Sequence, residues 1–386
     1  MNILYAITAL GVGGAENLIA DVCAGLVDKH NITVVFLRDK RNYEAQLNQM
    51  GIETIFIDIE KLGFLKAVLE IRKIIKQKKI EIVHTHLPAA DTSARLAALM
   101  SPRVQVFTTL HSEPWNTQDS LLLKLLIYYN KITVNRFKRS SLIAVSNIIK
   151  DMTADMEGIR RDKIQVLYNF IDVYNPKKTE EGFSFDIPTG GRYVMIVMAR
   201  LRPEKGHRVL FEAIAELVYE HGMNDILLLV LGEGDEREGL ELFVDELEIS
   251  RHICFIGARP NVYDYLRKSE LLVLPSELEG FSLTLLEAHY CKVPVLATDI
   301  PSNKEELHDG EHGVLFKKGN VQDLVQKIIL IRGGAYDLGK QVEKGHAFCM
   351  SLTRDAHIKA LMEIYTSRMM RQNNGRLVSQ AKRTKQ

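Results

Sequence analysis

The chain has 386 residues, which exceeds the size of one ordinary hydrophobic core and predicts two domains. Its formal net charge of +1 argues against a nucleic-acid partner. The four cysteines lie far apart in the sequence, which argues against a disulfide framework and against a zinc site. The sequence begins directly with a strand, and no apolar run reaches the roughly 18 residues of a membrane span. We therefore expect a cytoplasmic protein without a leader.

Short apolar runs alternate with longer amphipathic runs in the first half of the chain. The amphipathic runs have a helical period, as in 15–27, 65–75 and 94–100. Such alternation of strand and helix predicts right-handed crossovers and a parallel sheet. The expected strands are 3–7, 33–37, 54–57, 82–85, 104–109 and 142–145.

The alternation stops at 174–192, where prolines and glycines with a few charged residues give the composition of a linker. We predict two Rossmann-like doubly wound domains, 1–173 and 190–353, facing across a cleft. A final amphipathic helix, about 354–369, could pack on either domain, and with the tail to 386 it could pack back on the first. The strands expected in the second domain are 194–198, 226–231, 253–256, 271–274 and 293–298.

The strongest functional signal follows the fourth expected strand of the second domain. Ser282 is suited to cap a helix whose first amides, those of Leu283 and Thr284, would favour a phosphate. Glu279 lies in the preceding loop. Glu287 follows on an almost wholly apolar helix, where a carboxylate needs a partner such as the vicinal hydroxyls of a ribose. The alternative is a solvent-facing Glu287 and an ordinary turn acid at 279.

The segment 279–288, Glu-Gly-Phe-Ser-Leu-Thr-Leu-Leu-Glu-Ala, resembles the paired-glutamate motif of the family 4 glycosyltransferases. These are retaining enzymes of the glycosyltransferase B fold, and the resemblance covers nearly the whole chain. It implies that Glu279 contacts hydroxyls of the transferred sugar and that Glu287 binds the nucleotide ribose. It also implies that the amides around Phe281, Ser282 and Leu283 hold the sugar and the distal phosphate.

Cations follow the first expected strand of the second domain. Arg200 and Lys205 lie in a loop that ends at Gly206, directly before a helix. A diphosphate leaving group gains negative charge as its bond breaks, and an enzyme that uses no metal needs cations at that place. Arg202 is an alternative to Arg200. The family pattern has an arginine and a lysine here, matching Arg200 and Lys205, and we expect no metal and no cofactor beyond the co-substrate.

A glycine-rich turn follows the first strand. Its spacing fails the dinucleotide fingerprint because the third glycine would fall at Glu16, which argues against a nicotinamide-dependent oxidoreductase. A plain helix-start turn remains open. The resemblance supports another role, since Gly13, Gly14 and Glu16 match the family's loop over the donor phosphates and the acceptor.

Histidines end two strands of the first domain. The family has a histidine that reaches the reacting sugar, and His111 matches it, although a structural histidine is the alternative. His84 and His86 share one face of a strand, but no third metal ligand lies nearby. His86 is a weaker candidate for contact with the acceptor. In the second domain, Gly232 and Arg259 follow strands and are expected to line the donor pocket.

Charge is distributed unevenly along the chain. Residues 1–190 carry about +3, residues 191–367 about −8 and residues 368–386 about +6. The run 121–139 joins apolar and basic residues, as in helices that lie at a membrane interface. A peripheral membrane contact through 121–139 and the basic tail is one interpretation. A buried crossover helix and a solvated tail are the other.

Together these features predict a glycosyltransferase of the hexosyltransferase type. The resemblance implies transfer with retention from a nucleotide-diphosphate sugar to a hydroxyl of a glycan or lipid-linked acceptor. It implies a front-face substitution, since no carboxylate is obviously placed as a nucleophile. A non-catalytic nucleotide-sugar-binding subunit and a nucleotide-sugar epimerase of the same fold are the alternatives.

Overall fold

The computed structural model describes residues 1–11, 13–112, 121–172, 190–259 and 262–383, with side chains described except at 121–123 and 371–383. The chain forms two compact units. Unit 1 comprises Met1–Asn169 and Arg354–Gln386, and unit 2 comprises Phe170–Thr353. The linker expected at 174–192 lies almost entirely outside the described residues.

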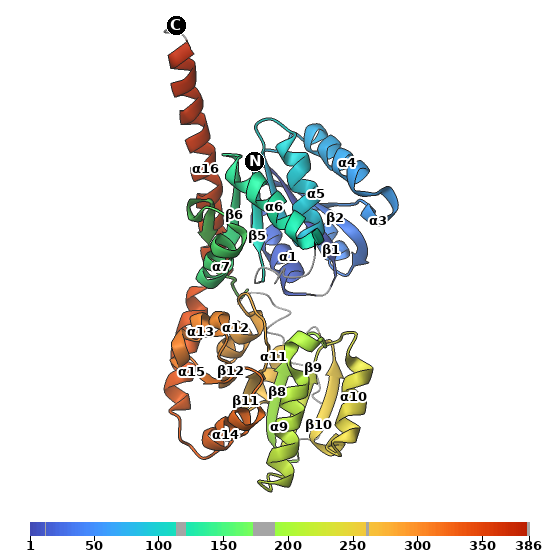
Figure 1. Ribbon diagram of the computed structural model, residues 1–386, viewed down its shortest axis with the longest axis vertical. Coiled ribbons are helices and arrows are strands. Elements are labelled where there is room, and N and C mark those ends of the chain that lie inside the picture. Colours follow the sequence, from blue (N-terminus) through green and yellow to red (C-terminus); the bar gives the residue numbers. More distant parts are fainter. Residues whose placement is uncertain (12, 113–120, 173–189, 260–261, 384–386) are drawn as a thin grey trace. The chain divides into compact units, whose positions relative to one another are not determined.

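Unit 1 is built on a seven-stranded parallel sheet (Figure 1) with the order β3-β2-β1-β4-β5-β6-β7. All six strands expected in this half are confirmed. β7 was not predicted, because three residues are too few for a periodic signal. The strands are β1 Asn2–Leu10, β2 Asn31–Arg41, β3 Glu53–Phe56, β4 Ile82–His86, β5 Gln105–Leu110, β6 Ser140–Ala144 and β7 Ile164–Val166.

Helices connect these strands and cover the sheet of unit 1. Ala67 and Ile71 of α4 and Ala94 of α5 pack on a face formed by Leu4 and Val35. The small alanines of α5 let this helix lie close to the strands beneath it. The helices are α1 Gly14–Leu26, α2 Glu44–Gln49, α3 Ile59–Leu62, α4 Phe64–Gln77, α5 Pro88–Leu99, α6 Leu121–Asn135, α7 Asn147–Glu157 and α16 Arg354–Arg383.

The C-terminal helix α16 belongs to unit 1. It packs closely on α1 at Gly25. A Cβ at this position would lie only 2.1 Å from Cδ1 of Ile358, so a larger residue would not fit. The buried Tyr365 hydroxyl lies within hydrogen-bond distance of the Tyr5 hydroxyl and of His84. The sequence predicted a helix of about 354–369, and the observed helix continues to Arg383. No proline interrupts the sequence after residue 369, so the backbone can extend the helix.

Unit 2 contains a six-stranded parallel sheet with the order β10-β9-β8-β11-β12-β13. The five predicted strands are confirmed, and the short β13 is additional. The strands are β8 Tyr193–Met198, β9 Ile226–Leu231, β10 Ile253–Gly257, β11 Leu271–Leu274, β12 Val295–Thr298 and β13 Val314–Phe316. The helices are α9 His207–Tyr219, α10 Arg237–Glu246, α11 Val262–Arg267, α12 Leu283–Tyr290, α13 Pro301–Glu306, α14 Val321–Arg332 and α15 Leu338–Ser351.

Two hydrophobic cores enclose the sheet of unit 2. Alternate residues of β8 enter opposite cores: Met195 and Val197 pack with α9 and α14, and Val194 and Ile196 pack with α12. Both faces of the strand are therefore buried, which explains its unbroken apolar sequence.

Both sheets reverse their strand order at one point, between β1 and β4 in unit 1 and between β8 and β11 in unit 2. Ligands of doubly wound sheets bind outside the carboxyl ends of the strands at such a reversal. The loops that follow these four strands are therefore the places to examine for a site.

Candidate active site

The loop after β8 carries two of the expected cations. Arg200 is exposed, and Lys205 closes a short 3-10 turn, Pro203–Lys205. Gly206 follows with a left-handed φ of 69° and precedes α9. A Cβ on Gly206 would lie 2.1 Å from the carbonyl oxygen of Pro275, so only glycine lets the β8 loop approach the β11 loop this closely.

Lys205 and Glu279 form an ion pair across these two loops. The Lys205 Nζ atom lies 2.7 Å from Oε1 of Glu279, and the side chains are only 15% and 14% exposed. The Glu277 amide also donates to the carbonyl of Glu204, at 2.9 Å. The structure thus joins two predicted site residues that are 74 positions apart, at the point where the strand order of unit 2 reverses.

Helix α12 begins beside this pair. Ser282 caps the helix, and its hydroxyl accepts a hydrogen bond from the amide of Leu285. The amide of Ser282 itself, one of the expected phosphate ligands, donates to Oε2 of Glu306 at 2.7 Å. The first helical amides, of Leu283 and Thr284, have no acceptor within the helix, so they are the donors that this helix start offers to an anion.

Glu306 is a site residue that sequence reasoning missed. Its side chain is 1% exposed, and burial raises the pKa of its carboxyl group well above the ordinary value, assisted by the nearby charge of Glu279. Glu306 ends α13, whose buried positions Ser302, Asn303 and Glu306 are all polar. The residues after Pro301 in this helix are all polar, so no sequence pattern distinguishes Glu306 and only the fold shows that it is buried.

Glu287 lies on α12 and is half-buried, with Ala288 and Leu286 buried beside it. The role expected for this carboxylate, binding the ribose of the donor, stays a prediction. One turn earlier, the Thr284 hydroxyl donates to the carbonyl of Met198, the last residue of β8, at 3.1 Å. This bond fixes the start of α12 to the end of the strand that precedes Arg200.

Gly232 follows β9 and approaches the β8 loop closely. Its φ is 146°, and a Cβ there would lie 1.8 Å from the carbonyl oxygen of Ala199. The Gly232 amide donates to the carbonyl of Gly257 at 3.1 Å. Arg259 lies two residues after Gly257, and its side chain is exposed. The ends of β8, β9 and β10 are therefore held together at the same edge of the sheet as the ion pair.

A buried histidine lies under the cationic loop and gives unit 2 an acid-sensitive stability. His207 is 2% exposed, and neither ring nitrogen has a hydrogen-bond partner among the described residues. Burial, together with the charge of Lys205, lowers the pKa of His207 from 6.5 to about 4. The unfolded chain therefore takes up a proton more readily than the folded chain. Stability is lost as pH falls below about 6.5, and the loss continues down to about pH 4.

Substitution of His207 with leucine is expected to remove this dependence. At pH 5 the histidine costs about 2 kcal/mol relative to pH 7, so the fall in unfolding free energy between these pH values should shrink by about that amount in the variant. Urea unfolding followed by circular dichroism measures it. His221→Leu is the control, since His221 is exposed just beyond the same helix. An unchanged pH dependence in His207→Leu would show that the folded protein protonates this ring freely.

In unit 1 the structure joins His111 to His86. The Nδ1 atom of His86 lies 2.9 Å from Nε2 of His111. His86 is the last residue of β4, and His111 directly follows β5, the neighbouring strand. His111 is half-buried, whereas His86 is 3% exposed. Burial lowers the pKa of His111 to about 4, so its ring is neutral at neutral pH.

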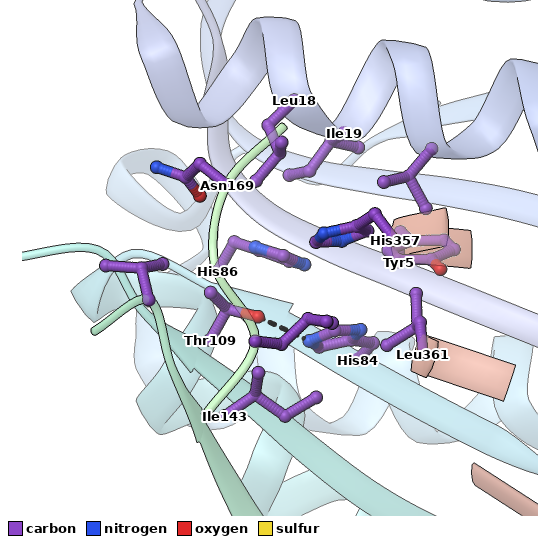
Figure 2. A pocket seen from close by; sticks show the side chains of 13 residues that line it. Tyr5, Leu18, Ile19, His84, His86, Thr109, Ile143, Asn169, His357 and Leu361 are labelled. Carbon is purple, nitrogen blue, oxygen red and sulfur yellow. Dashed lines mark hydrogen bonds between the residues drawn. The ribbon is translucent and has the colours of Figure 1, made fainter. Parts of the chain in front are cut away.

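A second set of polar groups surrounds His84, which lies beside His86 (Figure 2). His84 hydrogen-bonds to the Thr109 hydroxyl at 2.7 Å and to the Tyr365 hydroxyl at 2.6 Å. Tyr365 in turn lies 3.2 Å from the Tyr5 hydroxyl. The rings of His84, His86 and Tyr5 line a small enclosed cavity. His84 is therefore a structural residue that ties the C-terminal helix to the sheet.

The glycine-rich turn of unit 1 follows β1. Gly13 is extended, with a φ of 177°, and precedes α1. The Glu16 carboxylate lies against Gly13. A Cβ on Gly13 would be only 2.5 Å from Oε2 of Glu16. Gly14 is exposed. This turn follows β1, and the histidine pair lies at the ends of β4 and β5. All of these residues are therefore at the carboxyl edge of the same sheet.

The expected site residues accordingly fall into two groups. Gly13, Gly14, Glu16, His86 and His111 belong to unit 1. Arg200, Lys205, Gly232, Arg259, Glu279, Phe281, Ser282, Leu283 and Glu287 belong to unit 2. Within the residues that the structure describes, no cluster of three histidine, cysteine or acidic side chains is arranged to hold a metal ion.

Comparison with known proteins agrees with this architecture. Residues 12–174 match the family model described as Glycosyltransferase Family 4, and residues 179–333 match the model described as Glycosyl transferases group 1. Two doubly wound units of this strand order make up the glycosyltransferase B fold. The chain belongs to glycosyltransferase family 4 and is a glycosyltransferase.

Two curated relatives align with most of the chain. One is the N-acetylgalactosamine-N,N'-diacetylbacillosaminyl-diphospho-undecaprenol 4-alpha-N-acetylgalactosaminyltransferase of Campylobacter jejuni, 27% identical over 83% of this chain and 87% of that protein. The other is the UDP-Gal:alpha-D-GlcNAc-diphosphoundecaprenol alpha-1,3-galactosyltransferase of Escherichia coli, 22% identical over 72% of this chain and 73% of that protein.

Among solved structures, the Anabaena protein Alr3699/HepE, crystallised with UDP, has the same fold. It superposes with a TM-score of 0.80 at 20% identity, covering 95% of this chain and all of that one. The similarity confirms the predicted fold of two doubly wound domains.

Proposed function

We propose that this glycosyltransferase moves a sugar from a nucleotide-diphosphate sugar to a hydroxyl of a glycan or lipid-linked acceptor, with retention and without a metal ion. The observation that carries the proposal is the pairing of Lys205 with Glu279 beside the start of α12. This pairing brings a cation, a carboxylate and the first amides of a helix to the point where the strand order of one sheet reverses. The relatives that act on diphospho-undecaprenol-linked sugars support this class of acceptor.

The donor diphosphate fits the cationic edge of unit 2. Arg200 and Lys205 would neutralise the charge that develops on the diphosphate as the glycosidic bond breaks, which is the task a metal ion performs in other enzymes. The amides of Leu283 and Thr284 and the dipole of α12 add to the attraction. The UDP bound in the crystal structure of HepE, a protein of the same fold, favours a nucleoside diphosphate as the ligand.

The carboxylates of unit 2 have separate roles in this proposal. Glu279 is bound to Lys205 and would orient the sugar by accepting hydrogen bonds from its hydroxyls, rather than attack the anomeric carbon. Glu287, two turns further along, would hold the ribose. Glu306 would keep the loop before α12 in place through the Ser282 amide. Gly232 and Arg259 would line the nucleotide pocket, and Gly13, Gly14 and Glu16 of unit 1 would contribute to the phosphate and acceptor side.

A front-face substitution accounts for retention with these residues. The leaving phosphate takes the proton of the acceptor hydroxyl while that hydroxyl forms the new bond on the same face of the sugar. His111 of unit 1 would position the sugar as a neutral hydrogen-bonding group, since burial lowers its pKa to about 4. No covalent glycosyl-enzyme intermediate is needed.

A calorimetric donor screen tests the donor half of the proposal. UDP-, GDP-, ADP- and TDP-sugars are titrated into the wild-type protein and the Glu287→Ala variant. One base should bind clearly in the wild type and about tenfold or more weakly in Glu287→Ala, because two hydrogen bonds to the ribose are lost. Donor binding without transfer to any acceptor would favour a non-catalytic subunit. Conversion of the donor to its epimer would favour an epimerase.

We also propose peripheral contact with an anionic membrane, which would bring the protein to a lipid-linked acceptor. No helix of the described residues is long and apolar enough to cross a bilayer. On α6, within the predicted region 121–139, Leu125, Tyr128 and Ile132 are 56%, 62% and 41% exposed. Their spacing of three and four residues places them on one face of the helix. The exposed row argues against the alternative of a fully buried crossover helix.

A second surface of unit 1 has the same character. Leu65 and Leu69 of α4 are 72% and 54% exposed. Leu69 also lines a groove of about 780 Å³ between α4 and the segment 100–104 that follows α5, and five basic side chains and one acidic side chain line this groove. Exposed leucines next to cations fit the headgroup region of an anionic bilayer. The basic side chains are Arg72, Lys73, Lys76, Lys79 and Arg103.

Flotation with vesicles tests the membrane contact. The wild-type protein should float with phosphatidylglycerol vesicles at low salt and not with phosphatidylcholine vesicles. The double variants Leu125→Glu with Tyr128→Glu and Leu65→Glu with Leu69→Glu should each lower the floating fraction by about half or more. Leu242→Glu is the matched control, since Leu242 is 58% exposed on α10 of unit 2. Equal flotation of all variants would refute both surfaces.

A further inference from the structure

The contact between His86 and His111 gives His86 a role that its sequence position does not reveal. The register of the sheet sets His86 of β4 opposite Thr109 of β5, two residues before His111. Nδ1 of His86 lies 2.9 Å from Nε2 of His111, with ring centroids 5.2 Å apart and planes inclined by 36°. Because His86 is 3% exposed, it is too deeply buried for direct contact with a large acceptor.

The surroundings of His86 restrict how it can hydrogen-bond. Its other ring nitrogen, Nε2, has no partner among the described residues. The ring lines a cavity of about 20 Å³, together with Asn169, His357 and Thr109 (Figure 2). That volume accommodates about one water molecule. His84 beside it is already bonded through both of its nitrogens, to Thr109 and Tyr365, so it does not bind His86.

These contacts favour one tautomer. Burial lowers the pKa of both His86 and His111, so both rings are neutral and one must donate its N–H to the other. If His111 donated from Nε2, the proton of His86 would sit on Nε2, a buried N–H that has no acceptor among the described residues and would depend on a water in the cavity, which is the more costly arrangement. If His86 instead donates from Nδ1, its Nε2 atom carries no proton and only a lone pair is left without a partner. His111 then accepts at Nε2 and carries its own proton on Nδ1.

We propose that His86 is a positioning residue for His111: it donates from Nδ1, fixes the ring plane of His111 and leaves the Nδ1–H of His111 as a donor toward the reacting sugar. This inference rests on the proposed function, in which His111 contacts that sugar. Nδ1 of His111 has no protein partner among the described residues, and the ring is half-buried, so this N–H is available to a ligand. A neutral N–H donor suits a hydroxyl oxygen of the sugar.

Steady-state kinetics of His86 variants test the proposal. His86→Leu should lower kcat about 100-fold with KM for the donor changed by no more than about threefold, because a misplaced His111 affects the reacting geometry rather than donor binding. His86→Asn keeps an N–H near the Nδ1 position and should recover to within about fivefold of the wild type. Tyr365→Phe, in the same polar cluster but bonded to His84 and Tyr5, should leave kcat unchanged.

A tautomer measurement separates this inference from the proposed function. Long-range proton–nitrogen NMR spectra of the histidine rings should show His111 protonated at Nδ1 in the wild type and a mixture of tautomers in His86→Leu. Wild-type kcat in a folded His86→Leu variant, or a proton on Nε2 of His111, would overturn the role of His86 and leave the transferase assignment intact. If the protein transfers no sugar, the proposed function fails, while the NMR spectra still decide the tautomer.

Discussion

Replacement of Lys205 with alanine is expected to lower turnover by about 100- to 1000-fold, the range found when one preorganised donor to a developing anion is removed. Lys205 is 15% exposed and held in place by Glu279, so its charge acts with little screening by water. Since the charge on the diphosphate grows as the bond breaks, the loss falls mainly on kcat, and donor affinity should change about tenfold or less.

The partner and the charge of Lys205 can be tested separately. Lys205→Arg keeps the charge and should recover part of the turnover, although its planar group cannot reproduce the geometry of an ammonium. Glu279→Gln should also lower turnover, and the double variant should lose less than the product of the two single losses, because the two residues act as a pair. A Lys205→Ala variant with wild-type kcat would remove this residue from the chemistry.

Substitution of Gly232 with alanine is expected to destabilise unit 2 by about 3–5 kcal/mol, combining backbone strain with overpacking. The added Cβ would lie 1.8 Å from the carbonyl oxygen of Ala199, and that backbone atom is fixed because the Ala199 amide donates to Leu231. The φ of 146° at Gly232 adds to this cost, because alanine rarely adopts this backbone conformation. Urea unfolding at constant pH measures the change.

Gly222 provides the matched control for Gly232. It also has a positive φ, of 67°, but a Cβ there meets no atom within 4 Å. Gly222→Ala should therefore cost only the conformational penalty of about 1–2 kcal/mol. Equal destabilisation by the two substitutions would show that the close approach of the β8 and β9 loops does not limit stability.

The strands of both sheets could be predicted from the sequence, apart from the short β7 and β13. Runs such as 226–231 are apolar throughout because both faces of the sheet are covered, and this pattern survives without any structural knowledge. Since ligands of such sheets bind at strand ends, the positions of Arg200, Lys205 and Glu279 after their strands already indicated one edge. The pairing of Lys205 with Glu279 required the structure, because it depends on β8 and β11 being neighbours.

Other features depend on packing that one sequence does not encode visibly. The bond between His86 and His111 depends on the register of β4 and β5. Glu306 lies in an ordinary polar segment, and only the fold buries it under the Ser282 amide. The exposed face of α6 was ambiguous for the same reason, since an apolar helix can be either buried or a contact surface. Long-range contacts, rather than local propensity, decide each of these cases.

The most direct test of the central claim is the stereochemistry of the reaction. The protein is incubated with the donor found by calorimetry and a lipid-diphosphate-linked sugar in the presence of a chelator, and the anomeric configuration of the product is read by NMR. We predict release of the nucleoside diphosphate with a new bond of the same configuration as the donor. An inverted product, or transfer that stops when divalent cations are removed, would contradict the account.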